Sequence, residues 1–162
     1  MKAIVAVDRN WGIGNKGELL FHIKEDMQFF KNMTTGNVVV MGKNTFESLP
    51  NKQPLKDRIN LVITPDGYEK HDNLIFGSME EIAEEAKKYN TNDVFVIGGG
   101  SIYEQLIPYC NTIYVTRIDA SKEADTFFPD LSQEGFMFEE VLETGKTEDG
   151  IYWSIEKWIG CF

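Results

Sequence analysis

The sequence has 162 residues, of which 42% are hydrophobic and 26% charged, so it fits one globular domain and is not typical of a disordered chain. Sixteen Lys and Arg against 26 Asp and Glu give a formal net charge of −10, which disfavours general binding to nucleic acid or anionic lipid. The apolar runs are too short to span a bilayer, the first residues lack a signal-peptide pattern, and Cys110 and Cys161 lack zinc-site spacing. We therefore expect a cytoplasmic protein with reduced thiols and no bound metal.

Strands and helices are predicted to alternate over the first 118 residues. The expected strands carry continuous β-branched runs, typical of strands covered on both faces; they span Ala3–Val7, Val38–Met41, Asn60–Ile63, Leu74–Phe76, Val94–Ile97 and Thr112–Arg117. The expected helices span Lys24–Met33, Asn44–Leu49, Met79–Tyr89 and Ser101–Ile107. Ser78 and Glu81 have the spacing of a capping box at the start of the third helix.

The last quarter of the sequence predicts strands only. Phe136–Glu143 and Tyr152–Trp158 alternate more between apolar and polar residues and indicate an antiparallel pair at one edge. We therefore predict a single α/β domain over residues 1–162. Its central sheet is mostly parallel, has about eight strands and an antiparallel C-terminal edge, and carries helices on both faces.

Ligands of such sheets bind at the carboxyl ends of the strands, and two of these ends run into a helix through glycine. One reads Gly42-Lys43-Asn44-Thr45 and the other Gly98-Gly99-Gly100-Ser101. Glycine allows a ligand to approach the backbone, and a helix start favours an anion, so the pair indicates a nucleotide site with Lys43 as a cation. Each turn alone is better explained as a plain tight turn, since glycine-rich turns are common, and neither matches a standard dinucleotide or P-loop motif.

The segment Trp11–Glu18 follows the first strand and contains three glycines. It is too polar and glycine-rich for a regular element, which predicts a loop. A loop at a strand end is either an active-site lid or an ordinary surface connection.

Asp26 lies within an apolar stripe of the helix expected at Lys24–Met33. It shares one side with Ile23, Met27, Phe30 and Met33. A carboxylate buried there would need a partner, and its apolar surroundings would raise its pKa. Alternatively, Asp26 lies in the first helical turn and points to solvent, where the helix dipole favours it. Spacing alone leaves both interpretations open.

Arg58 follows Pro54-Leu55-Lys56-Asp57 and enters a strand. Its guanidinium either binds a carboxylate with two hydrogen bonds or is solvated, as most arginines are. Several apolar residues either line a flat slot for a ring or belong to the core: Phe29, Phe30, Leu49, Leu55 and Ile97.

Taken in order, these motifs resemble the dihydrofolate reductase family over nearly the whole chain. The matching segments are Ala3–Val7, Trp11-Gly12-Ile13-Gly14, Asp26 with Phe29-Phe30-Lys31, Val40–Leu49, Pro54-Leu55 with Arg58, Val96–Tyr103, Tyr114-Val115-Thr116 and Asp125–Pro129. The resemblance implies a monomeric enzyme that uses NADPH to reduce 7,8-dihydrofolate to 5,6,7,8-tetrahydrofolate. Hydride would pass from nicotinamide C4 to pterin C6, while Asp26 holds the pterin and favours protonation at N5.

The resemblance also implies a role for individual residues. Thr116 would support Asp26 through a hydrogen bond, Phe30 and Leu49 would enclose the pterin and benzoyl groups, and Arg58 would bind the glutamate α-carboxylate. The implied substrate site comprises Ile4, Val5, Ala6, Leu19, Asp26, Met27, Phe30, Leu49, Leu55, Arg58, Ile97 and Thr116. The implied cofactor site comprises Ala6, Ile13, Gly14, Gly17, Gly42, Lys43, Asn44, Thr45, Thr64, Pro65, Ile97, Gly98, Gly99, Gly100, Ser101, Ile102, Tyr103 and Thr126, with the Gly98–Gly99 peptide in cis.

The sequence departs from the family pattern at several positions. Phe21 stands where the family usually has tryptophan, and it lacks the indole N–H that orders water near the pterin, so we expect altered proton delivery or affinity. Lys43 and Ser101 replace arginines found in many members, which leaves the preference for NADPH over NADH open. Asp57 and Ala124 replace glycines.

Two other functions remain open at this point. One is a related reductase acting on another heterocycle, such as a pyrimidine intermediate of riboflavin synthesis, which would give Arg58 no carboxylate to bind. The other is a non-catalytic module that binds a pterin or nucleotide without turnover.

Overall fold

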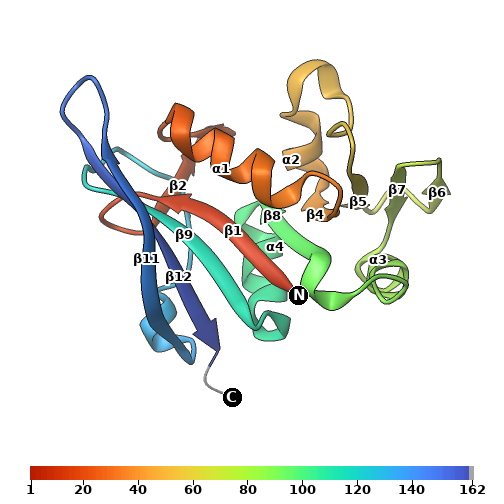
Figure 1. Ribbon diagram of the computed structural model, residues 1–162. Coiled ribbons are helices and arrows are strands. Elements are labelled where there is room, and N and C mark those ends of the chain that lie inside the picture. The colour runs from red at the N-terminus through yellow and green to blue at the C-terminus, as the bar shows by residue number, and fades with distance from the viewer. Residues whose placement is uncertain (161–162) are drawn as a thin grey trace.

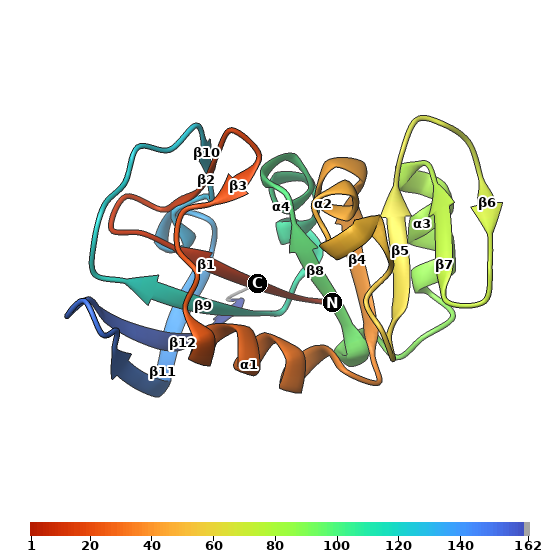
Figure 2. The ribbon, with the colours of Figure 1, turned by 90° about the horizontal axis from the view of Figure 1, so that it is seen from above.

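A computed structural model describes residues 1–160, and Cys161 lies outside this range. Within it, nine strands form one sheet in the order β11-β12-β9-β1-β8-β4-β5-β7-β6 (Figures 1 and 2). Their bounds in chain order are β1 Lys2–Val7, β4 Val38–Gly42, β5 Ile59–Ile63, β6 Glu69–Lys70, β7 Leu74–Gly77, β8 Val94–Gly98, β9 Thr112–Ile118, β11 Phe136–Lys146 and β12 Tyr152–Gly160.

The six strands from β9 to β7 in this order are parallel, whereas β12 and β11 are antiparallel at one edge and β6 is antiparallel at the other. The predicted mostly parallel sheet with an antiparallel C-terminal edge is therefore confirmed. The sheet has one strand more than expected, because the two-residue β6 carries no run of apolar residues that could reveal it.

Helices cover both faces of the sheet, as predicted (Figure 1). Helices α1 (Lys24–Thr34) and α2 (Lys43–Glu47) lie on one face, and α3 (Met79–Ala86) and α4 (Gly100–Leu106) lie on the other. The capping box of α3 forms: the Glu81 N–H donates to Ser78 Oγ, and the Ser78 N–H donates to Glu81 Oε1. The short 3₁₀ segments are Pro50–Lys52, Thr91–Asp93, Ile107–Tyr109 and Leu131–Gln133.

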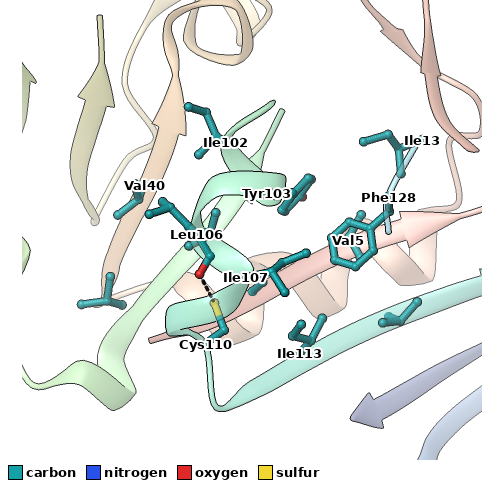
Figure 3. Packing of buried hydrophobic residues seen from close by; sticks show 14 of the residues in the cluster. Val5, Ile13, Val40, Ile102, Tyr103, Leu106, Ile107, Cys110, Ile113 and Phe128 are labelled. Carbon is teal, nitrogen blue, oxygen red and sulfur yellow. Dashed lines mark hydrogen bonds between the residues drawn. The ribbon is translucent and has the colours of Figure 1, made fainter. Parts of the chain in front are cut away.

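Because successive side chains of a strand point to opposite faces, the central sheet has a hydrophobic core on each face. Val39 and Met41 of β4 pack with Phe46 of α2 on one face, while Val38 and Val40 pack on the other face. Figure 3 shows this second core, in which Ile102, Tyr103 and Leu106 of α4 lie over Val5 and Ile113. Cys110 donates to the Leu106 carbonyl there, and burial raises the pKa of its thiol to about 12, so the thiol is neutral.

The segment after β1 is not the irregular loop that the sequence predicted. It forms β2 (Gly12–Asn15) and β3 (Glu18–Leu19), which make a small antiparallel sheet with β10 (Thr126–Phe127). The Asp125 N–H donates to the Gly14 carbonyl, and the Lys16 N–H donates to Asp125 Oδ2. The expectation was wrong because the partners that order this glycine-rich segment lie more than a hundred residues away.

Within residues 1–160, no helix is long and apolar enough to cross a membrane. No group of three or more His, Cys, Asp or Glu side chains in this range is arranged to hold a metal ion.

Candidate active site

Asp26 of α1 faces the sheet and not the solvent. Its Oδ1 accepts a hydrogen bond of 2.5 Å from Thr116 Oγ1 of β9, and Thr116 is itself 2% exposed. Burial raises the pKa of Asp26, and the hydrogen bond from Thr116 opposes this rise by stabilising the ionised form. The structure therefore favours the first of the two interpretations: Asp26 is a half-buried carboxylate with a neutral hydrogen-bond partner, and within residues 1–160 it forms no ion pair.

The surroundings of Asp26 are apolar and aromatic. Phe29 and Phe30 of α1 pack against a cluster formed by Ile4, Phe95 and Tyr114 on the strands beneath. Ile97 of β8 belongs to this cluster and also packs against the neighbouring one, which contains Leu49 and Leu55. The apolar residues predicted to line a slot are thus continuous in space, although they come from four segments of the chain.

Phe21 and Ala6 of β1 both pack against the cluster formed by Ile23, Ile118, Trp153 and Ile155. Lys122 contacts the segment Leu20-Phe21 twice: its Nζ lies 4.4 Å from the centroid of the Phe21 ring and donates a 2.8 Å hydrogen bond to the Leu20 carbonyl. Lys122 was not identified from the sequence, because a lysine in a polar loop carries no signal of its contacts.

Arg58 is half-buried and held by neutral groups. Its Nε donates to the Lys56 carbonyl at 2.9 Å and its Nη1 donates to Thr34 Oγ1 at 3.0 Å. Burial lowers the pKa of Arg58, and the charge of Asp57 partly offsets this. Within residues 1–160 the guanidinium forms no ion pair, and it lines an open pocket of about 380 Å³ with Asn37, Asn73 and Asp57. A cation that is oriented in advance and forms no ion pair is suited to bind a carboxylate from outside the chain.

The two glycine turns meet at the carboxyl ends of β4 and β8. The Gly98–Gly99 peptide is cis, as predicted. A Cβ added at Gly98 or Gly99 would lie 3.4 or 3.3 Å from Thr45 Oγ1, and one at Gly100 would lie 2.5 Å from Thr126 Cγ2. Glycine at these positions therefore allows the turn to pack closely against Thr45 and Thr126.

Tyr103 links the glycine turns to Asp26. Its hydroxyl donates a 2.7 Å hydrogen bond to the Ile4 carbonyl. Burial raises the pKa of Tyr103, and the negative charge of Asp26 raises it further, so the two groups are close enough to interact. Through this hydrogen bond α4, which follows the second glycine turn, is attached to β1, the strand that pairs with β9 and its Thr116.

At the outer end of the glycine turns, Lys43 Nζ lies 2.8 Å from Asp66 Oδ2. Thr64 Oγ1 donates to the same carboxylate oxygen at 3.1 Å. Asp66 was missed in the sequence, although its place in a Pro-Asp-Gly turn directly after a strand end could have marked it.

Other residues predicted for the substrate and cofactor sites lie on the opposite face of the sheet from Asp26 or are exposed. The Val5 side chain lies in the core beneath α4, on the opposite face from Asp26. Leu19 and Met27 are 62% and 61% exposed. The remaining exposed members are Gly17, Asn44, Pro65 and Ser101, and their part in binding stays a prediction.

A half-buried carboxylate, an arginine without an ion pair, and glycine turns at the ends of two parallel strands thus occur together in an α/β fold of the kind that binds ligands at the carboxyl ends of its strands. The family model described as dihydrofolate reductase matches residues 1–155. The chain belongs to the dihydrofolate reductase family.

Known proteins agree with this assignment. The viral dihydrofolate reductase of Saimiriine herpesvirus 2 is 35% identical over 96% of this chain and 83% of its own length. A bifunctional dihydrofolate reductase-thymidylate synthase of Glycine max is 36% identical over 79% of this chain, which spans only 28% of that protein. The solved dihydrofolate reductase of Enterococcus faecalis, complexed with NADP(H) and RAB-propyl, is 33% identical, with a TM-score of 0.82 over 98% of this chain and 94% of that one.

Proposed function

We propose that residues 1–162 form one catalytic domain that reduces 7,8-dihydrofolate to 5,6,7,8-tetrahydrofolate with NADPH. Membership of the dihydrofolate reductase family and the similarity to a solved relative bound to NADP(H) support the overall reaction. The observation that carries the proposal is the half-buried Asp26 carboxylate, which is hydrogen-bonded to Thr116 and lies one turn of α1 before the packed Phe29 and Phe30.

Asp26 binds the pterin by accepting hydrogen bonds from its N3–H and 2-amino groups. Its negative charge in an apolar environment makes protonation at pterin N5 more favourable, because few other charges or solvent dipoles screen it. The proton reaches N5 through water, and the hydride comes from C4 of the bound nicotinamide to C6, which is the chemistry that the cofactor supplies. The chain itself contributes positioning and electrostatics.

The residues around the two glycine turns fit a dinucleotide. Thr45 and Thr126 border the turn Gly98-Gly99-Gly100, where a side chain at any of the three glycines would press on one of them, and their hydroxyls are potential hydrogen-bond partners for a dinucleotide. Ala6 and Ile97, which pack in the same clusters as the aromatic side chains of α1, would contact the nicotinamide and the pterin.

Phe30 and Leu49 enclose the pterin and benzoyl groups, and Arg58 binds the α-carboxylate of the glutamate. Two fixed hydrogen bonds orient the guanidinium in advance, and no carboxylate of the described chain forms an ion pair with it. This favours a substrate that carries a carboxylate over a heterocycle without one.

The test is a spectrophotometric assay of NADPH oxidation with and without dihydrofolate. We expect absorbance loss only when protein, NADPH and dihydrofolate are all present. Asp26→Asn should reduce turnover by about 100-fold or more, the usual contribution of a positioned acid–base group. The matched control is Asp72→Asn, which changes an exposed aspartate before β7 and should leave the rate unchanged.

Absence of dihydrofolate-dependent oxidation at high protein concentration would reject the proposed reaction. Tight binding of NADPH and dihydrofolate in the same experiment, without turnover, would identify a binding module instead. Full activity of Asp26→Asn would reject the role of this residue.

A further inference from the structure

The pairing of β4 with β5 places Lys43 and Asp66 together at the edge of the cofactor site. Gly42 and Ile63 are register partners at the carboxyl ends of these strands, so the next residues of each, Lys43 and Thr64-Pro65-Asp66, emerge side by side. The 2.8 Å ion pair is completed by two contacts with Thr64: its hydroxyl donates to Asp66 Oδ2, and the Asp66 N–H donates to its oxygen at 3.2 Å. Asp66 is therefore fixed in place and not a freely rotating surface acid.

Lys43 is the single basic residue in the segments that follow the four neighbouring strands β4, β5, β7 and β8. Residues 42–47, 64–68, 77–81 and 98–104 contain no other Lys or Arg. Any phosphate bound at this edge of the sheet therefore has one side-chain cation available, and that cation is already engaged by a carboxylate.

The cofactors NADPH and NADH differ only in the 2′-phosphate on the adenosine ribose, so a residue that discriminates between them must act on that position. A dianionic phosphate attracts Lys43 and repels Asp66. A ribose 2′-hydroxyl, in contrast, donates a hydrogen bond to a carboxylate, which is how an Asp or Glu selects NADH in dinucleotide-binding folds. Both side chains are accessible to a ligand, since Lys43 is 43% and Asp66 63% exposed.

Building on the proposed function, we propose that Asp66 determines cofactor specificity: it lowers the preference for NADPH over NADH by competing with the 2′-phosphate for Lys43 and by accepting a hydrogen bond from a 2′-hydroxyl. The ion pair is exposed, and exposed pairs are weak enough to open when a phosphate arrives. Asp66 therefore weakens NADPH binding without preventing it. Mutual attraction lowers the pKa of Asp66 and raises that of Lys43, so both are charged at neutral pH.

The test is calorimetric titration of the full chain with NADP⁺ and with NAD⁺, which measures binding without catalysis. Asp66→Asn should tighten NADP⁺ binding about five-fold, the size of a favourable exposed charge interaction, and should weaken NAD⁺ binding. Lys43→Met should weaken NADP⁺ binding and leave NAD⁺ binding nearly unchanged. The effect on NADP⁺ should shrink as salt is raised, because the charges are exposed to solvent.

Glu84→Gln is the matched control. Glu84 forms an exposed 2.8 Å ion pair with Lys87 on α3, so this variant removes the same kind of contact away from the glycine turns and should change neither titration. Equal effects of Asp66→Asn on NADP⁺ and NAD⁺, no effect on either, or an unchanged NADP⁺ affinity in Lys43→Met would overturn the inference. If one of these three outcomes is found while the wild-type chain binds NADP⁺ and reduces dihydrofolate, only the inference on Asp66 fails. If the wild-type chain binds neither nucleotide, the proposed function fails with it.

Discussion

Asp26 and Asp66 carry the same side chain at opposite ends of the site, and their environments differ. Asp26 is half-buried, has a neutral hydrogen-bond donor and has its pKa raised by burial. Asp66 is exposed, bonds to Lys43, and has its pKa lowered by that partner. Desolvation is the main cause of the pKa shift of Asp26, and pairing with Lys43 is the main cause of the shift of Asp66. The half-buried environment suits Asp26, whose charge is proposed to favour protonation of a bound ring. The exposed environment suits Asp66, whose charge is proposed to change the affinity for a phosphate.

The same contrast extends to the two cations. Arg58 is oriented by Thr34 and the Lys56 carbonyl and forms no ion pair within residues 1–160, while Lys43 is held by a carboxylate. We therefore expect the substrate end of the site to be specific for its anion and the cofactor end to be permissive.

Of the effects that test this contrast between the two ends of the site, the largest is expected at Arg58. Arg58→Gln should lower kcat/KM for dihydrofolate about 100-fold, because a two-pronged, charge-assisted contact with the substrate carboxylate is lost. A 7,8-dihydropterin without the glutamate tail should be reduced equally by variant and wild type. Lys52→Gln, at an exposed cation nearby in sequence, serves as the control. An equal loss with both substrates would show that Arg58 supports the fold and does not bind the tail.

A smaller effect is expected from Thr116→Val, which removes the only side-chain donor recorded for Asp26 within the described chain. The rate should fall about ten-fold, in line with one hydrogen bond to a charged group. Because this bond lowers the pKa of Asp26, its loss should move the Asp26-dependent limb of the pH–rate profile to higher pH. A lower rate with an unshifted profile would contradict the electrostatic role of Thr116.

The two aspartates should also affect stability with opposite sign. The raised pKa of Asp26 means that its favourable contribution exists below the unfolded pKa of 3.8 and is lost as pH rises through the folded value. Asp26→Asn should therefore be more resistant to urea than wild type at pH 7, with the difference narrowing toward acid pH. Asp66 has a lowered pKa, so its contribution exists above 3.8, and Asp66→Asn should be equal to or slightly less stable than wild type at pH 7. The measurement is urea unfolding of both variants at pH 5 and 7, and a less stable Asp26→Asn at pH 7 would break the comparison.

Sequence alone predicted the buried strands, the helices and the antiparallel edge, because period and β-branched runs are local signals. The order of motifs led to Asp26, Arg58 and the glycine turns; in the structure Asp26 near the start of α1 is bonded to Thr116, and Arg58 is bonded to Thr34 at the end of the same helix. The sequence did not predict the small sheet formed by β2, β3 and β10, because Gly14 and Lys16 are hydrogen-bonded to the distant Asp125. Asp66 and Lys122 were missed for the same reason: each acts through a contact that only the fold creates.

Asp57, which stands where the family usually has glycine, gives the smallest predicted effect. Its φ of +61° lies in the left-handed region, and its carbonyl accepts a 2.7 Å hydrogen bond from the Gly36 N–H, so the conformation is fixed. Asp57→Gly should relieve the cost of a side chain there and raise the free energy of unfolding by about 0.5 kcal/mol, since the entropy of glycine offsets part of the gain. Urea midpoints measure this change, and a destabilised variant would contradict it.

Asp57→Asn separates backbone from charge, because asparagine tolerates the same conformation. The negative charge of Asp57 attracts the Arg58 guanidinium, as Asp66 attracts Lys43, but without an ion pair. Removing it should therefore lower the KM for dihydrofolate by less than two-fold, the effect of a screened exposed charge. If the KM for dihydrofolate instead fell about five-fold, as the dissociation constant of NADP⁺ is expected to fall in Asp66→Asn, then Arg58 and Lys43 would be restrained by their acidic neighbours in the same way. The contrast between the two ends of the site would then rest on Asp26 and Asp66 alone.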